Sequence, residues 1–375
     1  MKILMILSNP FTHDSRVYNE AKTLIKAGYD VTVLAWDRKR ENLLNEEKEG
    51  IHIVRSYNTK LMNILPYDIF RLHFWWKKGY IDALGLFEKK PFDVVHCHNL
   101  DTLPIGIKLK RKFGIQLVYD AHEIWGYMVA RDIPKWWSNY YLWKERQLIK
   151  HVDKVITVNE PLKKYFCRIT NKTITIIMNC KNLEQTDYIH PKNSKLTLLY
   201  IGTLSKSRFL LELVDVVKDL KDVQCIIGGI GSKINYVNDL KEKCSKTSNV
   251  KFIGKVPMEE VLPMTKKVDV IICMTAPNDL NNSRALANKQ FEAMVCGRPI
   301  ICTKNTYPGE FTDKEKCGLV VEYTKENLKN AIKRLRDEDD LREQLGKNAL
   351  KTAIKEYNWE KQEEKLLELY KDLKK

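Results

Sequence analysis

Residues 288–301 read Asn-Lys-Gln-Phe-Glu-Ala-Met-Val-Cys-Gly-Arg-Pro-Ile-Ile, which predicts a short amphipathic helix followed at once by a strand. Gly297 is placed to end the helix in the left-handed conformation, and Pro299 cannot continue a helix, so the chain must turn sharply. A helix that leads directly into a β-branched strand is typical of parallel α/β sheets. Lys289 and Glu292 are three residues apart and share one face of this helix. They are suited to hold a phosphate and a sugar diol, and they equally fit an exposed ion pair.

The rest of the chain repeats this alternation of strands and helices in two runs. Strands are expected at Ile3–Leu7, Asp30–Ala35, Ile51–Arg55, Asp93–His98, Gln116–Tyr119 and Lys154–Val158, then at Thr197–Gly202, Gln224–Ile227, Val250–Ile253, Val268–Cys273 and Gly318–Val321. Helices are expected between them, for example over Leu103–Phe113, and a polar segment from Met178 to Lys195 separates the two runs. We therefore predict an α/β protein with two Rossmann-like domains, at residues 1–190 and 195–355, that face each other across a cleft.

Polar residues follow several predicted strands of the first run. His98 ends one strand, His122 and Glu123 follow the next, and Asn159 follows a third. Ligands of doubly wound sheets bind beyond the carboxyl ends of the strands, so these side chains are candidates for the cleft. Asn159 is equally suited to cap the helix that begins after it.

The composition narrows the class of protein. A chain of 375 residues, 44% of them hydrophobic, is long enough for two large cores. The net charge of +16 is scattered over both halves and accompanies no nucleic-acid-binding motif, so we expect no nucleic-acid partner. The nine cysteines are widely spaced and several lie in apolar runs, which is typical of a reduced, cytoplasmic protein. The N-terminus is read as a first strand and not as a signal peptide, and no apolar run is long enough to span a bilayer.

Two stretches rich in aromatic and basic residues interrupt the pattern, at 67–87 and 124–150. They hold six of the eight tryptophans, together with lysines and arginines. Such a mixture favours an anionic membrane surface, because the rings suit the interface and the cations suit the headgroups. The same residues also fit helices packed on their own sheet, or a dimer surface.

A set of short motifs resembles the retaining family-4 glycosyltransferases, also described as glycosyl transferases group 1, which have the GT-B fold. The motifs span essentially the whole chain and lie at His96–Asn99, Asp120–Glu123, Val158–Pro161, Met178–Asn179, Leu199–Gly202, Gly228–Gly231, Phe252–Gly254 and Asn288–Glu292. The resemblance implies that the N-terminal domain holds the acceptor and the C-terminal domain a nucleotide-sugar donor. It also implies that no metal or other cofactor is required, and that a C-terminal helix within 356–375 packs back on the first domain.

The resemblance also implies donor contacts. Glu292 is expected on the ribose, because a carboxylate accepts two hydrogen bonds from a vicinal diol. The loop that begins at Gly254 is expected to pack on the base through backbone groups, and Arg16 is expected to face the diphosphate at a helix start. The residues assigned to the donor are Arg16, Gly202, Lys206, Arg208, Gly254, Lys255, Val256, Asn288, Lys289 and Glu292.

The histidine of the transfer point in the family corresponds to His98, and Glu123 is the second residue that we expect at the chemistry. We expect His96 and His98 on opposite faces of their strand, with His98 toward the cleft and His96 in the core. Asp120 is interpreted as structural. A metal at the His-x-His pair would need further ligands, which the sequence does not indicate. Other candidates for the cleft are Ser15, His122, Asn159 and Asn179, the last of which also fits a turn of the linker.

Two positions depart from the family pattern. Thr203 stands where an arginine usually follows the glycine, and Arg284 stands where an acid usually lies eight residues before Glu292. We expect Lys206, Arg208 and Lys289 to meet the diphosphate charge instead, because fixed cations must do so where no metal does.

These observations predict an enzyme that transfers a sugar with retention from a nucleotide-diphosphate donor to a glycan or lipid-linked acceptor, in the synthesis of surface polysaccharides or glycoconjugates. Since no pair of carboxylates is placed as nucleophile and acid, the family's front-face attack is favoured over double displacement. We expect the protein in the cytoplasm or on the inner face of the plasma membrane. The alternatives are a sugar-nucleotide epimerase of the same architecture and a non-catalytic, transferase-like scaffold at the membrane.

Overall fold

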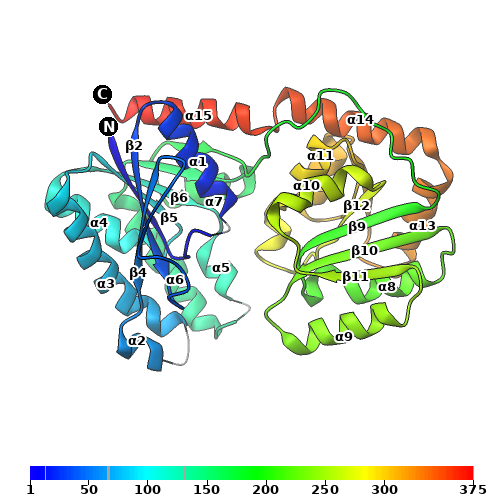
Figure 1. Ribbon diagram of the computed structural model, residues 1–375, viewed down its shortest axis with the longest axis horizontal. Coiled ribbons are helices and arrows are strands. Elements are labelled where there is room, and N and C mark those ends of the chain that lie inside the picture. The colour runs from blue at the N-terminus through cyan, green and yellow to red at the C-terminus, as the bar shows by residue number, and fades with distance from the viewer. Residues whose placement is uncertain (13, 66–67, 131, 375) are drawn as a thin grey trace. The chain divides into compact units, whose positions relative to one another are not determined.

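The fold comes from a computed structural model that describes residues 1–12, 14–65, 68–130 and 132–374. The chain forms two compact units (Figure 1). The first contains Met1–Met178 together with Glu363–Lys375, and the second contains Asn179–Gln362. The chain passes from one unit to the other within the segment that the sequence predicts to be a linker.

The first unit is built on an eight-stranded sheet with the order β3-β4-β2-β1-β5-β6-β7-β8, in which only β3 runs antiparallel to its neighbour. The strands are β1 (Lys2–Leu7), β2 (Asp30–Asp37), β3 (Asn45–Lys48), β4 (Ile51–Tyr57), β5 (Val94–His98), β6 (Gln116–Ala121), β7 (Lys154–Thr157) and β8 (Ile174–Ile176). The six strands predicted for this half are confirmed. The edge strands β3 and β8 were not predicted, because β3 is polar and β8 has only three residues.

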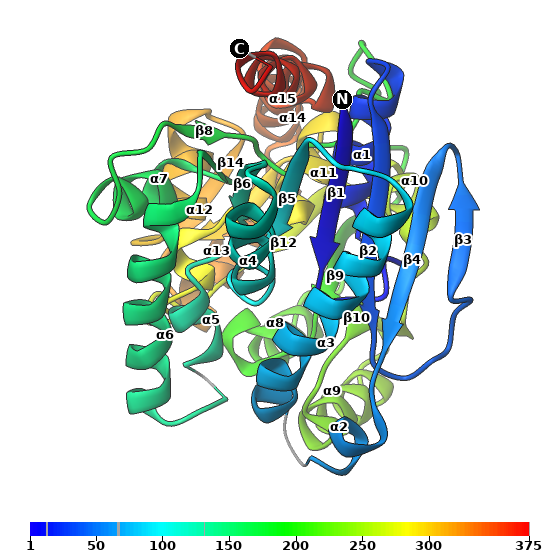
Figure 2. The same ribbon diagram turned by 90° about the vertical axis from the view of Figure 1, so that its left-hand side faces the viewer.

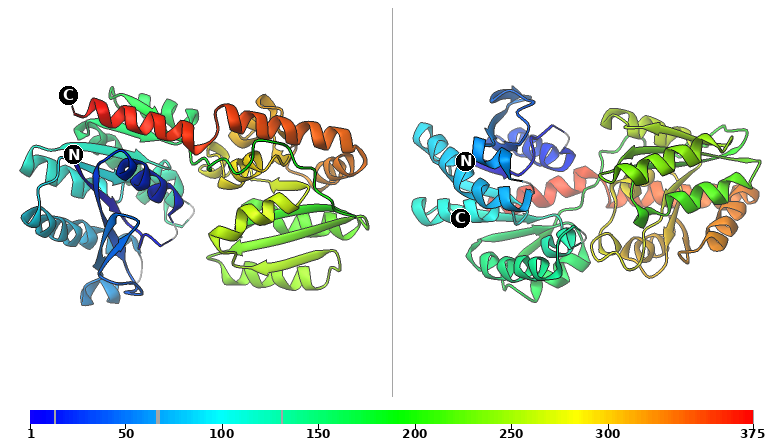
Figure 3. Two further views of the ribbon diagram at one scale, coloured as in Figure 1. Left: turned by 45° about the horizontal axis from the view of Figure 1, so that its top comes forward. Right: turned by 90° about the horizontal axis from the view of Figure 1, so that it is seen from below.

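Helices cover both faces of this sheet (Figure 2). They are α1 (Ser15–Lys26), α2 (Lys60–Ile64), α3 (Asp68–Lys89), α4 (Leu103–Phe113), α5 (Trp125–Val129), α6 (Lys135–Leu148), α7 (Glu160–Cys167) and the terminal α15 (Trp359–Asp372). On one face α4 approaches β5 so closely that a Cβ on Gly106 would lie 2.4 Å from Cys97 Sγ. On the other face Tyr370 of α15 bonds to His96 of β5. The terminal helix therefore packs on the first unit (Figure 3), as the resemblance implies.

The second unit has a fully parallel six-stranded sheet with the order β11-β10-β9-β12-β13-β14. The strands are β9 (Leu196–Thr203), β10 (Val223–Ile230), β11 (Val250–Gly254), β12 (Val270–Cys273), β13 (Ile300–Thr303) and β14 (Gly318–Val321). The helices are α8 (Leu210–Lys218), α9 (Ile234–Ser245), α10 (Met258–Lys267), α11 (Asn288–Val295), α12 (Tyr307–Lys314), α13 (Lys325–Asp337) and α14 (Asp339–Lys355). Gly297 lies just beyond α11 with φ +65°, so the left-handed helix end predicted there is confirmed.

The aromatic–basic stretches form α3, α5 and α6 and divide into two groups. Trp75 and Trp76 are buried in the core of the first unit, and Trp75 stacks on Trp36 with ring centroids 5.0 Å apart. In contrast, Trp136 and Trp143 of α6 are 64% and 57% exposed. Tyr67, the first residue of the earlier stretch, lies outside the described residues. None of the helices in the described ranges is both long and apolar enough to cross a membrane.

Candidate functional site

The strand order of the first sheet reverses between β1 and β5, and a buried polar cluster lies at this point. Arg16 is the second residue of α1, which begins after the N-cap Asp14, and it is only 3% exposed. Its Nε and one terminal nitrogen each donate to a different oxygen of Asp120, both at 2.9 Å. The other terminal nitrogen donates to the Ile177 carbonyl at 2.7 Å, and Glu20 lies 3.1 Å from the guanidinium. This side chain was expected to face the diphosphate of the sugar donor, but its N–H groups bond to residues of the first unit.

The two histidines of β5 share one face of the sheet, so the expectation that they point to opposite faces is wrong. Their rings stack with centroids 4.3 Å apart. Side chains alternate with a period of two along a strand, so positions two apart lie on the same face and Cys97 lies on the other. Both histidines are buried, and His98 Nδ1 lies 3.3 Å from Asp120 Oδ2. His122 Nε2 lies 3.0 Å from the same oxygen, and with 20% of its side chain exposed it is the histidine of the cluster that solvent reaches.

Asp120 is therefore the centre of the cluster and more than a residue that shapes a turn. Burial works against its charge, but Arg16 and His122 outweigh this effect and hold the pKa of Asp120 well below its usual range. Burial lowers the pKa of His98 and lowers that of His96 further, so both are neutral near pH 7. Burial also raises the pKa of Glu20 well above its usual range. Arg16 and Asp120 thus form an oppositely charged pair inside the cluster.

Four side chains of this cluster also form a group of the type that holds metals. Ligand atoms of Glu20, His96, His98 and Asp120 all lie within 4.8 Å of one another. The structure thus supplies the further ligands that the sequence did not indicate for the His-x-His pair. The Arg16 guanidinium contacts both acids, so a permanent cation already meets their charge and a divalent ion would be repelled at this distance. We assign no metal to this group.

Sequence reasoning missed three members of the cluster. Glu20 follows Arg16 by one helical turn, and that spacing could have indicated it. Asn99, with φ +64°, accepts a hydrogen bond from the backbone N–H of His122 at 3.0 Å. Tyr370 is buried 274 residues away from its partner, and its hydroxyl lies 2.9 Å from His96 Nδ1. Only the return of α15 to this sheet brings Tyr370 to the site.

The remaining candidates of the first unit lie around this cluster. Ser15 is the first residue of α1, and Glu123 is half-buried just beyond β6. Asn159 is buried and its side chain accepts the Leu162 N–H at 2.9 Å, so its role as the N-cap of α7 is confirmed. His13, in the loop before α1, lies outside the described residues.

In the second unit the strand order reverses between β9 and β12, and glycines make room there. Gly202 of β9 pairs in register with Gly229 of β10, and both have positive φ. A Cβ on Gly229 would lie 1.7 Å from the Gly202 carbonyl oxygen, so no larger residue fits. Gly254 ends β11 with φ +70° and is followed by the exposed Lys255. The next residue, Val256, packs against Gly228.

Lys289 lies at this reversal and is 8% exposed. Its ammonium is 3.7 Å from the centroid of the Tyr200 ring and close to Gly202, where an added Cβ would lie 3.0 Å from Nζ. Among the described residues it has no hydrogen-bond or ion-pair partner. Burial lowers its pKa to about 8; the nearby Cys273 thiol and Glu292 carboxylate oppose this effect, and the charge of Arg208 adds to it. The interpretation of Lys289 and Glu292 as a surface ion pair is therefore wrong.

Arg208 is the second cation of this edge and bonds to neutral groups. It follows Lys206 in a short 3₁₀ turn, Lys206–Arg208. One terminal nitrogen donates to Thr275 Oγ1 and the other to Asn282 Oδ1, each at 2.8 Å. Lys206 is exposed. Asp279, which accepts from Asn282, is the acid connected to Arg208 through this residue.

Glu292 lies one turn after Lys289 on α11 and is mostly buried. Its Oε1 is 3.4 Å from Lys181 Nζ, which is also in the second unit. At the start of the same helix Asn288 is exposed, and its side-chain oxygen accepts a hydrogen bond of 2.6 Å from Asn179. The structure therefore brings Asn179, Lys181 and two predicted donor residues to one end of α11.

Comparison with known proteins agrees with this arrangement. The family model described as Glycosyltransferase Family 4 matches residues 14–185, and the model described as Glycosyl transferases group 1 matches residues 184–352. The chain belongs to the family-4 glycosyltransferases. Among curated relatives, an uncharacterized glycosyltransferase of Methanocaldococcus jannaschii is 22% identical over 94% of this chain and 92% of its own length. Spore coat protein SA of Bacillus subtilis is 28% identical over 95% and 93%, respectively.

Solved structures give this glycosyltransferase the GT-B fold. Sucrose-phosphate synthase from Thermosynechococcus elongatus superposes with a TM-score of 0.80, at 17% identity, over 100% of this chain and 99% of its own. Anabaena HepE, solved in complex with UDP-glucose, superposes with a TM-score of 0.75, at 16% identity, over 99% and 100%. The two Rossmann-like domains of the GT-B fold correspond to the two units.

Both departures of this glycosyltransferase from the family pattern lie at the edge that holds Lys289. Thr203 is exposed at the end of β9, and its carbonyl accepts a hydrogen bond from the Tyr200 hydroxyl at 2.5 Å. Arg284 ends a 3₁₀ turn, Asn282–Arg284, and donates to the Leu280 carbonyl at 2.6 Å.

Proposed function

We propose that this enzyme transfers a sugar, with retention of configuration, from a nucleotide-diphosphate donor to a hydroxyl of a glycan or lipid-linked acceptor. A role in the synthesis of surface polysaccharides or glycoconjugates is part of this proposal. The donor would bind at the carboxyl edge of the second sheet, and no metal or other cofactor would be needed.

The observation that carries the proposal is the state of Lys289. A buried ammonium is costly to keep without a partner, and here it lies on an aromatic ring beside a glycine, next to a second cation, Arg208. An anionic ligand would relieve this cost. A diphosphate supplies the charge, and Gly202 has no side chain that would crowd the Lys289 ammonium beside it. Glu292, at the same end of α11, is placed to accept the hydroxyls of a ribose.

The names of similar proteins favour this donor and suggest an acceptor class. Anabaena HepE was solved with UDP and with UDP-glucose. A relative that is 22% identical over 72% of this chain is the alpha-monoglucosyldiacylglycerol synthase of Streptococcus pneumoniae, whose product name describes a glycosylated lipid. The exposed Trp136 and Trp143 on α6 suit a peripheral place on the cytoplasmic face of a membrane.

Retention by front-face attack is favoured by the state of the acids in the first unit. Asp120 is held by Arg16, and Glu20 is buried beside the same guanidinium, so neither is placed as an exposed nucleophile. In the proposed step the bond from the anomeric carbon to the donor phosphate breaks, and a bond to the acceptor oxygen forms on the same face. The leaving phosphate takes the acceptor proton. The histidine cluster would orient the reactants.

Thermal shift with a panel of nucleotide sugars tests the donor. A ligand at a hundred times its dissociation constant adds about 2.7 kcal/mol of stability, so the preferred nucleotide should raise the melting temperature clearly. Glu292→Ala should weaken binding of that nucleotide about tenfold or more while the far-ultraviolet circular dichroism stays unchanged. Glu259→Ala, an exposed acid on α10, is the matched control. An unchanged affinity in Glu292→Ala would refute the ribose contact. Conversion of the donor without an acceptor would indicate an epimerase.

A further inference from the structure

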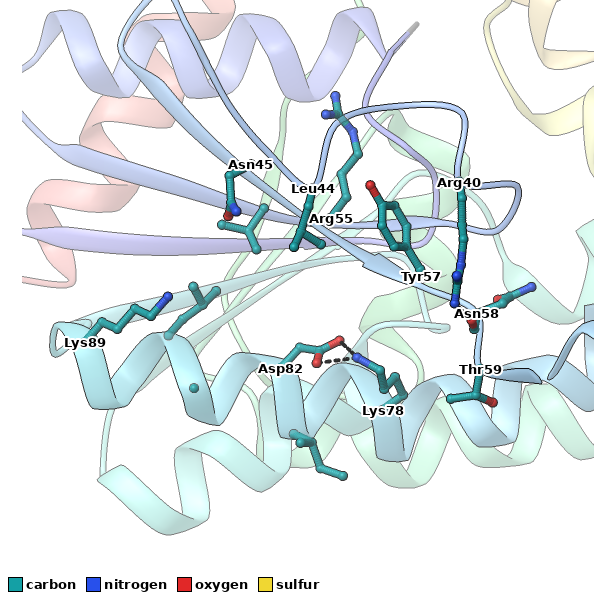
Figure 4. Close-up of a pocket in the computed structure, with 14 residues that line it drawn as sticks. Arg40, Leu44, Asn45, Arg55, Tyr57, Asn58, Thr59, Lys78, Asp82 and Lys89 are labelled. Carbon is teal, nitrogen blue, oxygen red and sulfur yellow. Dashed lines mark hydrogen bonds and ion pairs between the residues drawn. The ribbon is translucent and has the colours of Figure 1, made fainter. Parts of the chain in front are cut away.

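A groove of about 500 Å³ lies in the first unit, away from both strand reversals (Figure 4). It runs between α3 and the edge of the sheet formed by β3 and β4. Its size is within the range of pockets that bind small molecules. None of the residues expected at the donor or at the chemistry lines it.

Four aliphatic side chains line the groove, among polar and charged ones. The four are Leu44, just before β3, Val54 of β4, and Ile81 and Leu86 of α3. Between the last two, Gly85 leaves the helix surface bare, because a Cβ there would have no atom within 4 Å. Leu44 and Ile81 are both exposed, so an apolar surface faces water here without a covering segment among the described residues. Exposed apolar surface of this kind marks sites that bind apolar partners.

Cations lie at both ends of the groove. Arg40 is at one end, where its guanidinium donates to the Asn58 carbonyl at 2.9 Å and lies 5.4 Å from the Tyr57 ring centroid. Lys89 is exposed at the other end. The acid of the groove, Asp82, is already held by Lys78 and by the Ser56 hydroxyl. Arg40 and Lys89 thus leave the groove with excess positive charge.

We propose that this groove binds an anionic amphiphile, a molecule with an alkyl chain and a phosphate head. The chain would lie along the aliphatic walls, and the phosphate would bind at a cationic end. The aliphatic side chains contribute little binding free energy for a free phosphate, and the two cations contribute little for an uncharged lipid. The combination therefore favours a molecule that has both parts. The inference deepens the proposed function, because a lipid-linked acceptor has this chemistry, and it rests on that function only for the use of the ligand as acceptor.

The position of Arg40 places one end of the groove at the same edge of the sheet as the histidine cluster. Arg40 lies just after the carboxyl end of β2, and Asn58 and Thr59 follow the carboxyl end of β4. In a parallel sheet these ends share one edge with the carboxyl end of β5, which carries His98. Since β4 and β5 are separated by two strands, the distance along the edge is roughly 14 Å at about 4.8 Å per strand. A head group bound near Arg40 would therefore be within the length of a short glycan of the histidine cluster.

Gly85 provides a direct test. Gly85→Phe fills the groove, whereas Gly85→Ala leaves most of it open and should make α3 more stable because alanine is the better helix former. Binding of dodecyl phosphate, kept below its micellar concentration, is measured by isothermal titration calorimetry without any donor. We expect Gly85→Phe to weaken binding at least tenfold and Gly85→Ala to retain it. Equal binding to both variants would overturn the proposal.

Two further experiments test separately whether the phosphate and the alkyl chain of the ligand are recognised. Inorganic phosphate and uncharged dodecyl maltoside should each bind at least tenfold more weakly than dodecyl phosphate. Arg40→Gln with Lys89→Gln should reduce binding of dodecyl phosphate, while Lys77→Gln, on α3 but not lining the groove, should not. Equal affinity for inorganic phosphate or dodecyl maltoside would overturn the proposal, as would insensitivity to the paired substitution. Donor binding is measured separately, so failure of the groove and failure of the donor site give different results.

Discussion

The carboxyl edges of the two sheets both gather charged side chains where the strand order reverses, but they handle charge in opposite ways. In the first unit Arg16 is buried against Asp120 and Glu20, so the cluster is balanced. In the second unit Lys289 is buried on the Tyr200 ring, beside Arg208, and among the described residues no carboxylate forms an ion pair with its ammonium. The first edge pairs its buried cation with acids of its own unit, and we propose that an anionic ligand meets the buried cation of the second.

The same kind of change should therefore have opposite consequences at the two edges. A cation that is held by acids supports the fold, so loss of either partner leaves a buried charge uncompensated. A buried cation whose partner is a ligand lowers the stability of the free protein. Its removal should therefore weaken ligand binding and leave the free energy of unfolding unchanged. The following predictions test this contrast, beginning with the largest expected effect.

Asp120→Asn should reduce the free energy of unfolding of the first unit by about 3–5 kcal/mol, because the buried Arg16 loses the carboxylate that accepts two of its hydrogen bonds and keeps only Glu20 beside it. All tryptophans except Trp359 lie in the first unit, so tryptophan fluorescence during urea unfolding reports mainly on this unit. Glu49→Gln, which removes an exposed ion pair with Lys22, is the control and should cost less than about 1 kcal/mol. A loss no larger than in this control would show that the first cluster does not support the fold.

Lys289→Met should behave in the opposite manner. Binding of the preferred nucleotide sugar should weaken about 100-fold, or about 2.7 kcal/mol, because the cation placed for the diphosphate is gone. The melting temperature without ligand should stay the same or rise, because a buried, unpaired ammonium is replaced by an apolar chain of similar length. Calorimetric titration measures the first effect and thermal melting the second. Clear destabilisation with intact affinity would reverse the assignment of this edge.

Local signals were enough to predict most of the fold from the sequence. The bounds of α4 and the turn at Gly297 depend on neighbours within a few residues, and both are confirmed. The strands were recognisable because parallel strands are buried and apolar. The edge strand β3 carries no such signal, since it is exposed and reads Asn-Glu-Glu-Lys.

The site was less accessible to sequence reasoning, because its contacts join distant positions. Arg16 and Asp120 are 104 residues apart, and His96 and Tyr370 are 274 residues apart. A motif can indicate that each residue matters, but it cannot show which partner uses its charge. Arg16 was therefore expected at the donor, and Asp120 was underestimated. The error on His96 and His98 was avoidable, because the period of the strand places them on one face.

The smallest expected effect is the pH dependence of donor binding. This measurement compares the two edges in the wild-type protein, so no charged side chain has to be replaced. Burial sets the pKa of free Lys289 at about 8. A bound diphosphate favours the charged amine, so above pH 8 binding must take up a proton and affinity should fall by up to about tenfold, or 1.4 kcal/mol, per pH unit.

Titration calorimetry between about pH 7 and 9, in buffers of different ionisation enthalpy, measures both the affinity and the proton uptake. Lys289→Arg keeps its charge over this range, so its affinity should not depend on pH there. Arg16 is already an arginine whose pKa is raised by Asp120 and Glu20 against the effect of burial, so the first edge contributes no titration of its cation in this range. Wild-type binding that is flat from pH 7 to 9, without proton uptake, would mean that the Lys289 ammonium does not meet the donor, and the contrast between the edges would then lose its functional meaning.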